Sequence, residues 1–442
     1  MKLSVFVHDI PVATLESTDN FEHVLSYHPD IEETNFVSLL MPVRTKSYNY
    51  PDLHPFFRMN LPEGYLLSVL QEQFGPHLGA SPLSLLSIVG RNAIGRIKVA
   101  PYGSDPTTAP IHFDLKDILR GENSEAAFEH LVRRFAASGV SGVVPKFLSP
   151  SSALSLSGHK KATLPTDKYI IKGTTSQLPG VALNEHFCME VAQRAFNHAA
   201  RTELSDDGQA LVVHRFDYDE DGVTRLGMED LCSLLALRPE EKYESTWEKV
   251  AGRIIQVTPV KNQPKALSDL ANLLLLTYAL RNADCHTKNI AVLYSNFDDV
   301  RLAPVYDMLT ITVYDDYCNN PPGMPIGGRS TWQPKKALGI YLQTRCRLSA
   351  AEVRERVERL CEAIVEVSPD VVRASSTYQN FGTTGPRMLR AWDEGMNSLR
   401  LSKSWSLPSL DSLLQNENIS KVSVPKEPPR TKIGKSTLSM LS

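Results

Sequence analysis

The 442-residue sequence lacks the features of a membrane or secreted protein. A helix that crosses a bilayer needs ~20 apolar residues in a row, and the leucine run at Leu273–Leu276 is far too short. The first residues, MKLSVFVHDIPVATL, alternate apolar and polar side chains and contain no apolar core of the ~7–15 residues that a signal peptide requires. We therefore expect a soluble, cytoplasmic protein that does not bind a membrane.

Paired cysteines and an excess of basic residues are also missing. The six cysteines lie between Cys188 and Cys361 and form no CxxC pair, which argues against a disulfide scaffold and against a zinc site made of paired thiolates. The 47 Lys and Arg residues are balanced by 50 Asp and Glu residues, for a net charge of −3. A protein dominated by a nucleic-acid surface normally has a strong basic excess, so such a surface is not expected.

Length and composition predict three folded units and a tail. At ~150 residues per domain, a chain of this length holds two or three domains. Pro101, Gly103 and Pro106 mark a first boundary, and the residues from Lys403 onward are rich in Ser, Pro and Lys, which is typical of a flexible tail. We expect an N-terminal unit at 1–102, an N-lobe at 103–235, a helical lobe at 236–402 and a tail at 403–442.

Hydrophobic periodicity predicts mixed strands and helices in the first half of the chain. In the N-terminal unit, LSVFVHD and VATLEST form a predicted hairpin, EGYLLSVLQEQF a helix, and SPLSLLSIVGRNAIGRIKVAPYG a helix, a turn and a strand. The second unit begins with the helix SEAAFEHLVRRFAAS, which has an apolar face of Phe128, Leu131, Val132 and Phe135. The strands KYIIKG and ALVVHRFDY follow, with the helix LNEHFCMEVAQRAF between them.

From about Met228 onward, helices are predicted to dominate. The segment ALSDLANLLLLTYALRN is apolar nearly all round, which favours a buried helix. Ser349 and Glu352 form a capping-box pattern that opens the helix AAEVRERVERLCEAIVEV.

The stretch NADCHTKNIAVLY carries the densest group of chemically useful side chains. Asp284, Cys285 and His286 are consecutive, so their side chains diverge and do not easily surround one zinc ion. Asp284 and Asn289 are instead spaced like the Asp and Asn of the catalytic loop of protein kinases, where the Asp accepts a hydroxyl proton and the Asn holds Mg²⁺. A predicted hairpin follows and places Asp307 where a second oxygen ligand for Mg²⁺ is needed.

Three upstream features fit the same phosphoryl-transfer chemistry. The segment SGVSGVVPKF contains Gly139 and Gly142, whose backbone N–H groups can approach a phosphate closely. Lys172 lies in the predicted strand KYIIKG and can reach phosphate oxygens, and Glu185 near the start of the next helix can pair with Lys172. The order of glycine loop, lysine strand, glutamate helix and catalytic loop is that of a kinase.

In several motifs and in their order, the sequence resembles the HipA-like serine/threonine kinases of bacterial toxin–antitoxin modules. The resemblance runs from about residue 35 to 345, through NADCHTKNIAVL, LAPVYDM, HRFD, MEDLC followed by KYES, YIIKG and LLSIVGRNAIG. It implies an α+β, protein-kinase-like fold with two lobes. The N-lobe would contain a mixed or antiparallel sheet, the C-lobe would be mainly helical, and a small α+β subdomain would precede them.

The resemblance also implies site residues for ATP and Mg²⁺. Asp284 would be the catalytic base, supported by His286, while Lys288 would act near the γ-phosphate. Lys172, aided by Glu185, would bind phosphates. The Mg²⁺ ligands would be Asn289 and Asp307. The hinge would contact adenine through its backbone, at Met228, Glu229 and Leu231.

The family's known biology implies partners and regulation. These toxins typically phosphorylate aminoacyl-tRNA synthetases, are held inactive by a small helix-turn-helix antitoxin, and meet DNA only through that antitoxin. Many autophosphorylate a serine of the glycine-rich loop, which here corresponds to Ser141 beside Gly142, with Ser138 as the neighbouring candidate. The loop departs from the family pattern because Val144 stands where a Gln is common.

Two other classes of function stay open. Small-molecule phosphotransferases share the D-x-H-x-x-N pattern, and a largely non-catalytic lobe that binds an antitoxin or a DNA complex would keep the same fold. The presence of Lys172, Asp284, Asn289 and Asp307 together favours a catalytic protein.

Overall fold

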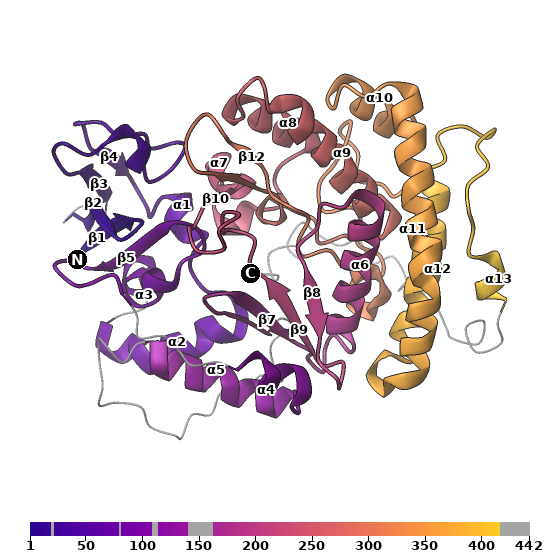
Figure 1. Cartoon of the computed structure of the whole chain (residues 1–442), viewed down its shortest axis with the longest axis horizontal. Helices are drawn as coiled ribbons and strands as arrows, with labels where there is room; N and C mark the ends of the chain where they lie inside the picture. The colour runs from indigo at the N-terminus through magenta and orange to yellow at the C-terminus, as the bar shows by residue number, and fades with distance from the viewer. Residues whose placement is uncertain (19–21, 79–80, 108–113, 140–161, 416–442) are drawn as a thin grey trace, which may run out of the picture.

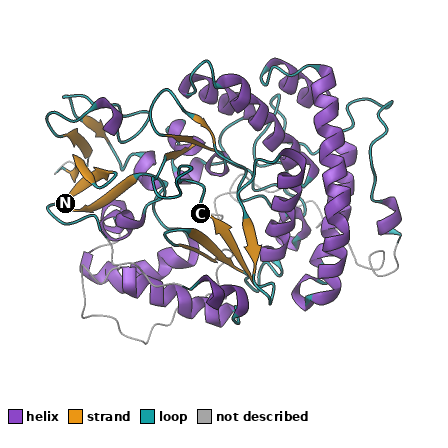
Figure 2. Ribbon diagram, in the orientation of Figure 1, coloured by secondary structure: helices purple, strands orange, loops and turns teal. Residues whose placement is uncertain are grey.

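The structure is a computed structural model that describes residues 1–18, 22–78, 81–107, 114–139 and 162–415. The fold is α+β, and the described strands form three antiparallel sheets of five, four and three strands. Figures 1 and 2 show the strands gathered toward the N-terminal side of the molecule and the long helices of the C-terminal half on the opposite side.

The first unit is a five-stranded sheet in the order β4-β3-β2-β1-β5. Its strands are β1 (Lys2–Val7), β2 (Ile10–Ser17), β3 (His23–Tyr27), β4 (Tyr48–Tyr50) and β5 (Ile97–Pro101). The predicted hairpin is confirmed: Val7 pairs with Ile10, and His8 and Asp9 both have positive φ, as the tight turn of a hairpin requires. The helices α1 (Pro55–Arg58) and α3 (Pro82–Val89) add apolar side chains to the core of this sheet.

The second sheet has the order β6-β7-β9-β8 and is covered on both faces. Its strands are β6 (Ala162–Pro165), β7 (Tyr169–Gly173), β8 (Thr202–Leu204) and β9 (Ala210–His214). Alternate residues of β9 enter two cores: Leu211 and Val213 join the core that contains α6 (Val181–Phe196), while Ala210 and Val212 face α2 (Gly64–Leu78) and α5 (Glu125–Gly139). The short helix α4 (Leu115–Arg120) joins the second core through Ile118.

The N-terminal unit and the N-lobe share that second core. Tyr65 and Val69 of α2 are buried beside Phe128 and Val132 of α5, and all four pack on the four-stranded sheet. Figure 1 shows α2, α4 and α5 as a row of helices beneath β7 and β9. The two units are therefore fused by packing, and a domain boundary near residue 102 stays a prediction.

The third sheet, β10-β11-β12, joins the lobes. Its strands are β10 (Gly227–Asp230), β11 (Ala291–Tyr294) and β12 (Arg301–Leu302). The predicted hairpin of β11 and β12 is confirmed. β10 pairs with β11 although more than 60 residues separate them; such a long-range pairing is not visible in local sequence patterns.

The remaining helices build the C-lobe. They are α7 (Leu231–Leu234), α8 (Trp247–Val257), α9 (Gln263–Ala279), α10 (Lys336–Thr344), α11 (Ala350–Thr377), α12 (Thr384–Ser398) and α13 (Asp411–Leu414). α9 is the predicted buried helix, with Leu274, Leu275 and Leu276 fully covered. None of the helices in the described ranges combines the length and the apolar character that crossing a bilayer requires.

The packed structure at the C-terminal end of the lobe extends beyond the predicted limits. The capping box of α11 is confirmed, because the Glu352 N–H donates to the Ser349 Oγ at 3.2 Å and the Ser349 N–H donates to the Glu352 carboxylate at 2.8 Å. α11 continues ten residues past the predicted end because Val371 still lies on its buried face. Of the predicted tail, residues 403–415 pack against the lobe through the buried Leu410.

Candidate functional site

A charged triad joins the two lobes. Lys172 on β7 donates to Glu185 of α6 at 2.7 Å and to Asp307, beyond β12, at 2.6 Å. The side chains of Lys172 and Asp307 are 20% and 23% exposed, so the triad is open to ligands on one side. Burial alone would lower the pKa of Lys172, but the two carboxylates outweigh burial and raise it.

Asn289 and Asp307, the two predicted metal ligands, are hydrogen-bonded to each other. The Asn289 Nδ2 donates to the Asp307 Oδ2 at 2.5 Å, and the Asn289 Oδ1 accepts from the His286 N–H at 3.2 Å. Asp307 has a φ of 55°, in the left-handed region that few non-glycine residues occupy. Backbone strain of this kind concentrates at functional positions, where the surrounding structure holds it in place.

The donor set at this point fits Mg²⁺. Such sites use one or two carboxylates together with phosphate oxygens and water, and Asp307 and Asn289 supply only hard oxygen ligands. The Asn289 amide currently turns its nitrogen toward Asp307. Binding of a cation between them therefore requires that this hydrogen bond opens.

Asp284, the predicted base, is held by a tyrosine that sequence reasoning did not assign. The Tyr243 hydroxyl donates to the Asp284 Oδ1, and the His286 Nε2 lies 3.9 Å from the same oxygen. The Asp284 N–H donates to the Asn282 side chain at 3.0 Å, which fixes the start of the loop. Tyr243 belongs to the KYES motif, so a signal was present, but no spacing rule linked it to Asp284.

Lys288 forms a contact with the N-terminal unit that was also not predicted. It forms an ion pair with Glu63 of the N-terminal unit. Burial would lower the pKa of Lys288, but Glu63 and Asp230 raise it. Burial raises the pKa of Asp230 to about 6, although the charge of Lys288 acts in the opposite direction. A lysine expected near a γ-phosphate is thus paired with Glu63 and lies within the electrostatic influence of Asp230.

The predicted hinge residues make hydrogen bonds and apolar contacts outside the charged triad. The Glu229 side chain is fully buried and accepts hydrogen bonds from the Leu39 N–H at 2.6 Å and the Ser38 hydroxyl at 2.9 Å, both in the N-terminal unit. The Leu231 N–H donates to the Ile290 carbonyl at 2.8 Å, and Met228 packs in a small core with Leu293. The adenine contact expected of these residues stays a prediction.

The predicted glycine-rich loop begins at the end of α5. Ser141 and Gly142 lie outside the described residues. Ser138 falls in the last turn of α5, which ends at Gly139. The roles expected of these residues, including autophosphorylation at Ser141, therefore stay predictions.

Cys285, one of the three consecutive residues weighed as zinc ligands, is buried. It is 1% exposed, and burial raises the pKa of its thiol to about 12. In the described part of the chain, no three His, Cys, Asp or Glu side chains converge as ligands of one metal ion.

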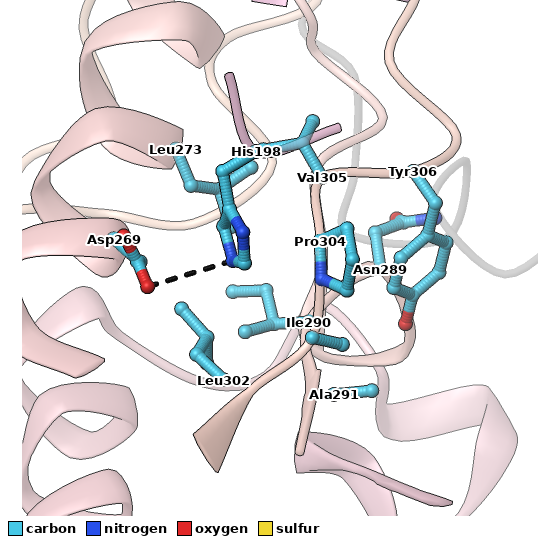
Figure 3. Close-up of a pocket in the computed structure, with 11 residues that line it drawn as sticks. His198, Asp269, Leu273, Asn289, Ile290, Ala291, Leu302, Pro304, Val305 and Tyr306 are labelled. Atoms are coloured by element: carbon cyan, nitrogen blue, oxygen red, sulfur yellow. Dashed lines mark ion pairs between the residues drawn. The ribbon is translucent and has the colours of Figure 1, made fainter. Parts of the chain in front are cut away.

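A small pocket lies behind the catalytic loop, where Asn289 forms part of one wall. On the opposite wall the His198 Nε2 lies 3.5 Å from the Asp269 carboxylate. Figure 3 shows His198 turned toward Asp269, with Pro304 between it and Tyr306. Lys172 and Asp284 do not line this pocket, so it is separate from the ligand side of the triad.

Two family models match the chain, one in its N-terminal unit and one from residue 138 onward. A model of the HipA N-terminal domain matches residues 3–100, and a model of the HipA-like C-terminal domain matches residues 138–368. "Putative kinase Y4mE" of Sinorhizobium fredii is 28% identical over 78% of this chain and 85% of its own length. "Putative kinase Y4dM" of the same organism is 24% identical, over 71% and 78%.

A solved structure has the same architecture. The chain matches a chain of the complex of the Shewanella oneidensis MR-1 toxin–antitoxin system of HipA, HipB and operator DNA with a TM-score of 0.62, at 17% identity, over 90% of this chain and 96% of that one. The predicted fold class is confirmed: an N-terminal α+β unit precedes a two-lobed, protein-kinase-like fold. Because the C-terminal match alone covers more than half of the residues, this protein belongs to the HipA-like family.

Proposed function

We propose that this protein is an ATP-dependent serine/threonine protein kinase that acts as the toxin of a toxin–antitoxin pair. The observation that carries the proposal is a chain of three hydrogen bonds that links Glu185 to Lys172, Lys172 to Asp307, and Asp307 to Asn289. These residues come from four separate segments of the sequence. Phosphoryl transfer depends on positioning and on neutralising charge, and this arrangement supplies groups for both.

Each residue has a role in the proposed reaction. Lys172, oriented by Glu185, binds phosphate oxygens of ATP. Asp284 accepts the proton of the acceptor hydroxyl as that oxygen attacks the γ-phosphorus. Asn289 and Asp307 are the residues that would hold Mg²⁺, which neutralises phosphate charge when it is bound.

Lys288 binds the γ-phosphate and His286 supports the loop. The backbone of the hinge at Met228, Glu229 and Leu231 holds the adenine. ADP leaves after the bond between the γ-phosphorus and the bridging oxygen breaks.

The proposed protein substrate is part of the translation machinery, an aminoacyl-tRNA synthetase. The proposed partner is a small helix-turn-helix antitoxin, through which DNA would be met indirectly. The solved relative in a complex with HipB and operator DNA supports this partner class. The family membership supports the toxin role.

Expression of wild type and of Asp284→Ala in bacteria tests the proposal. We expect growth arrest only with wild type, together with a phosphorylated target found by phosphoproteomics after brief induction. Arrest that persists with Asp284→Ala contradicts the catalytic role and favours a non-catalytic binding protein. Phosphate transfer to small alcohols but not to proteins favours a small-molecule phosphotransferase.

We also propose autophosphorylation at Ser141. A phosphate adds a charge of about −1.5 to −2, which beside Gly142 would repel the phosphates of ATP and stop further reaction. Mass spectrometry of wild type and Ser141→Ala after incubation with ATP and Mg²⁺ tests the site. Phosphate on Ser138 in both proteins would place the modification there instead.

A further inference from the structure

The segment around Tyr243 is fixed to the catalytic loop one residue away from the tyrosine. The Lys242 carbonyl accepts from the Thr287 N–H at 3.2 Å and from the Thr287 hydroxyl at 2.9 Å. Thr287 is fully buried and Lys242 is 8% exposed, so both hydrogen bonds are shielded from water. The backbone next to Tyr243 therefore moves with the loop that carries Asp284.

The ring and the hydroxyl group of Tyr243 each contact a residue of the catalytic loop. Its ring packs edge-on against the imidazole of His286, with the centroids 4.9 Å apart and an interplanar angle of 77°. Its hydroxyl donates to the Asp284 Oδ1. Tyr243 therefore constrains the base, because the ring cannot shift without disturbing His286 and the hydroxyl occupies one carboxylate oxygen.

We propose that Tyr243 is a positioning residue for Asp284, an inference that rests on the proposed kinase activity. A carboxylate has about four lone-pair sites, so one hydrogen bond from Tyr243 leaves others for the acceptor hydroxyl. The bond sets the orientation of the carboxylate that has to face the acceptor hydroxyl. Tyr243 itself neither binds ATP nor exchanges a proton with the acceptor.

Tyr243→Phe tests the inference, because it removes the hydroxyl and keeps the ring on His286. A hydrogen bond to a charged group contributes about 1.5–3 kcal/mol. We expect kcat for ADP release from MgATP to fall about 10- to 100-fold, the range of that energy at 1.4 kcal/mol per tenfold change, while KM for ATP changes less than about twofold. If Tyr243 contributed only the packing of its ring, Tyr243→Phe would leave kcat unchanged.

The matched control is Tyr341→Phe. The buried Tyr341 hydroxyl donates to the Trp247 carbonyl at 2.9 Å, in the helical lobe and away from Asp284. We expect this variant to lose stability, measured by urea unfolding, and to keep kcat. The comparison separates loss of a buried phenol hydrogen bond from loss of a contact to the base.

A double-mutant cycle gives the decisive readout. If Tyr243 acts only through Asp284, Tyr243→Phe lowers ADP release no further in an Asp284→Asn background than Asp284→Asn does alone. Equal and additive losses in both backgrounds overturn the inference. An inactive wild type overturns the proposed kinase function and this inference with it. An active wild type with an unchanged Tyr243→Phe overturns only the inference.

Discussion

Two clusters of opposite charges connect separate parts of the molecule, and they differ in burial and in the pairing of their charged groups. In the first, Arg215 donates to Asp217 through Nε at 2.9 Å and through Nη2 at 2.5 Å, and both side chains are 2% exposed. Asp217 also accepts from the Gly95 N–H at 2.7 Å. In the second, Lys172 faces both Glu185 and Asp307, and the group is about one-fifth exposed at Lys172 and Asp307.

The difference separates a structural pair from a ligand site. The Arg215–Asp217 pair is bidentate and closed, and it connects the N-lobe to the N-terminal unit through Gly95. The Lys172 triad brings two carboxylates to one ammonium group, and the side chains of Lys172 and Asp307 are partly exposed. We expect the first cluster to control stability and the second to control activity, and replacements of Lys172 and Asp217 test that division directly.

Replacement of Lys172 by Met has the largest expected effect. The variant loses the group that binds phosphates, and single charged contacts in phosphoryl transfer are worth about 10³–10⁵ in rate. We expect a loss of about 10⁴-fold in kcat/KM for ATP, equivalent to ~5.5 kcal/mol. The free energy of unfolding should change by about 2 kcal/mol at most, because the triad is partly open to solvent.

ADP-release kinetics and urea unfolding of the same Lys172→Met preparation check both numbers. Lys168→Met is the matched control, since the Lys168 ammonium group donates to the Gly222 carbonyl on the exposed side of the lobe. A stability loss larger than the activity loss would contradict the division between the clusters.

Replacement of Asp217 by Ala should have the largest effect on stability. It leaves the Arg215 guanidinium buried without its carboxylate, and breaking a buried pair in this way costs about 3–5 kcal/mol. The control is Glu241→Ala, which breaks the exposed Arg238–Glu241 pair and should cost about 0–1 kcal/mol. Urea unfolding of both variants measures the difference, and a loss below ~1 kcal/mol for Asp217→Ala would show that the closed pair is not structural.

The buried carboxyl group of Glu229 is expected to make the free energy of unfolding depend on pH. Burial raises the pKa of its carboxyl group from 4.5 to about 7, although hydrogen bonds from Leu39, Tyr294 and Ser38 lower it in part. Between these values the folded protein holds one more proton than the unfolded chain, so the free energy of unfolding falls as the pH rises from about 4.5 to about 7. A rise in pKa of this size corresponds to on the order of 3 kcal/mol.

Glu229→Gln isolates that contribution. Its amide oxygen can accept from the Leu39 N–H and the Tyr294 hydroxyl, which both bond the Glu229 Oε1, and its nitrogen can donate to the Ser38 hydroxyl. The neighbouring charges of Arg96 and Asp230 are present in both proteins and cancel in the comparison. We expect equal stability at pH 5 and a more stable variant at pH 8, measured by urea unfolding; parallel pH curves would refute this.

Sequence reasoning predicted the parts of the site that depend on order along the chain. Lys172 lies in a recognisable strand, and Asn289 and Asp307 flank a recognisable hairpin, so the order of motifs is enough to group them. Tyr243 and Glu63 were missed because their partners Asp284 and Lys288 lie 41 and 225 residues away, and only packing brings them together.

The limits of local patterns also explain what was missed in the fold. Periodicity predicted that β9 is a strand, but not that its two faces enter different cores. Arg215 and Asp217 were noticed as part of HRFD, but the closure of their pair depends on Gly95, which belongs to another unit. The burial of a charge is a property of the assembled lobes rather than of a motif.

Replacement of Glu63 by Gln has the smallest expected effect and tests the open side of the site most directly. Glu63 forms an ion pair with Lys288, the lysine proposed to bind the γ-phosphate, and the Glu63 side chain is 54% exposed. An exposed pair contributes only about 0.2–1 kcal/mol. If phosphate replaces Glu63 at Lys288, loss of the Glu63 charge should therefore tighten ATP binding about two- to fivefold.

Titration calorimetry with ATP and Mg²⁺ measures the change, and Glu241→Gln serves as a control carboxylate that pairs with Arg238 instead. Weaker ATP binding by Glu63→Gln would mean that Glu63 orients Lys288 for the phosphate rather than competing with it. The N-terminal unit would then complete the ligand side of the site. Tighter binding would instead make Glu63 a group that the nucleotide displaces, and Lys288 would then belong to the ligand side of the site, as proposed for Lys172, and not to a closed pair such as Arg215–Asp217.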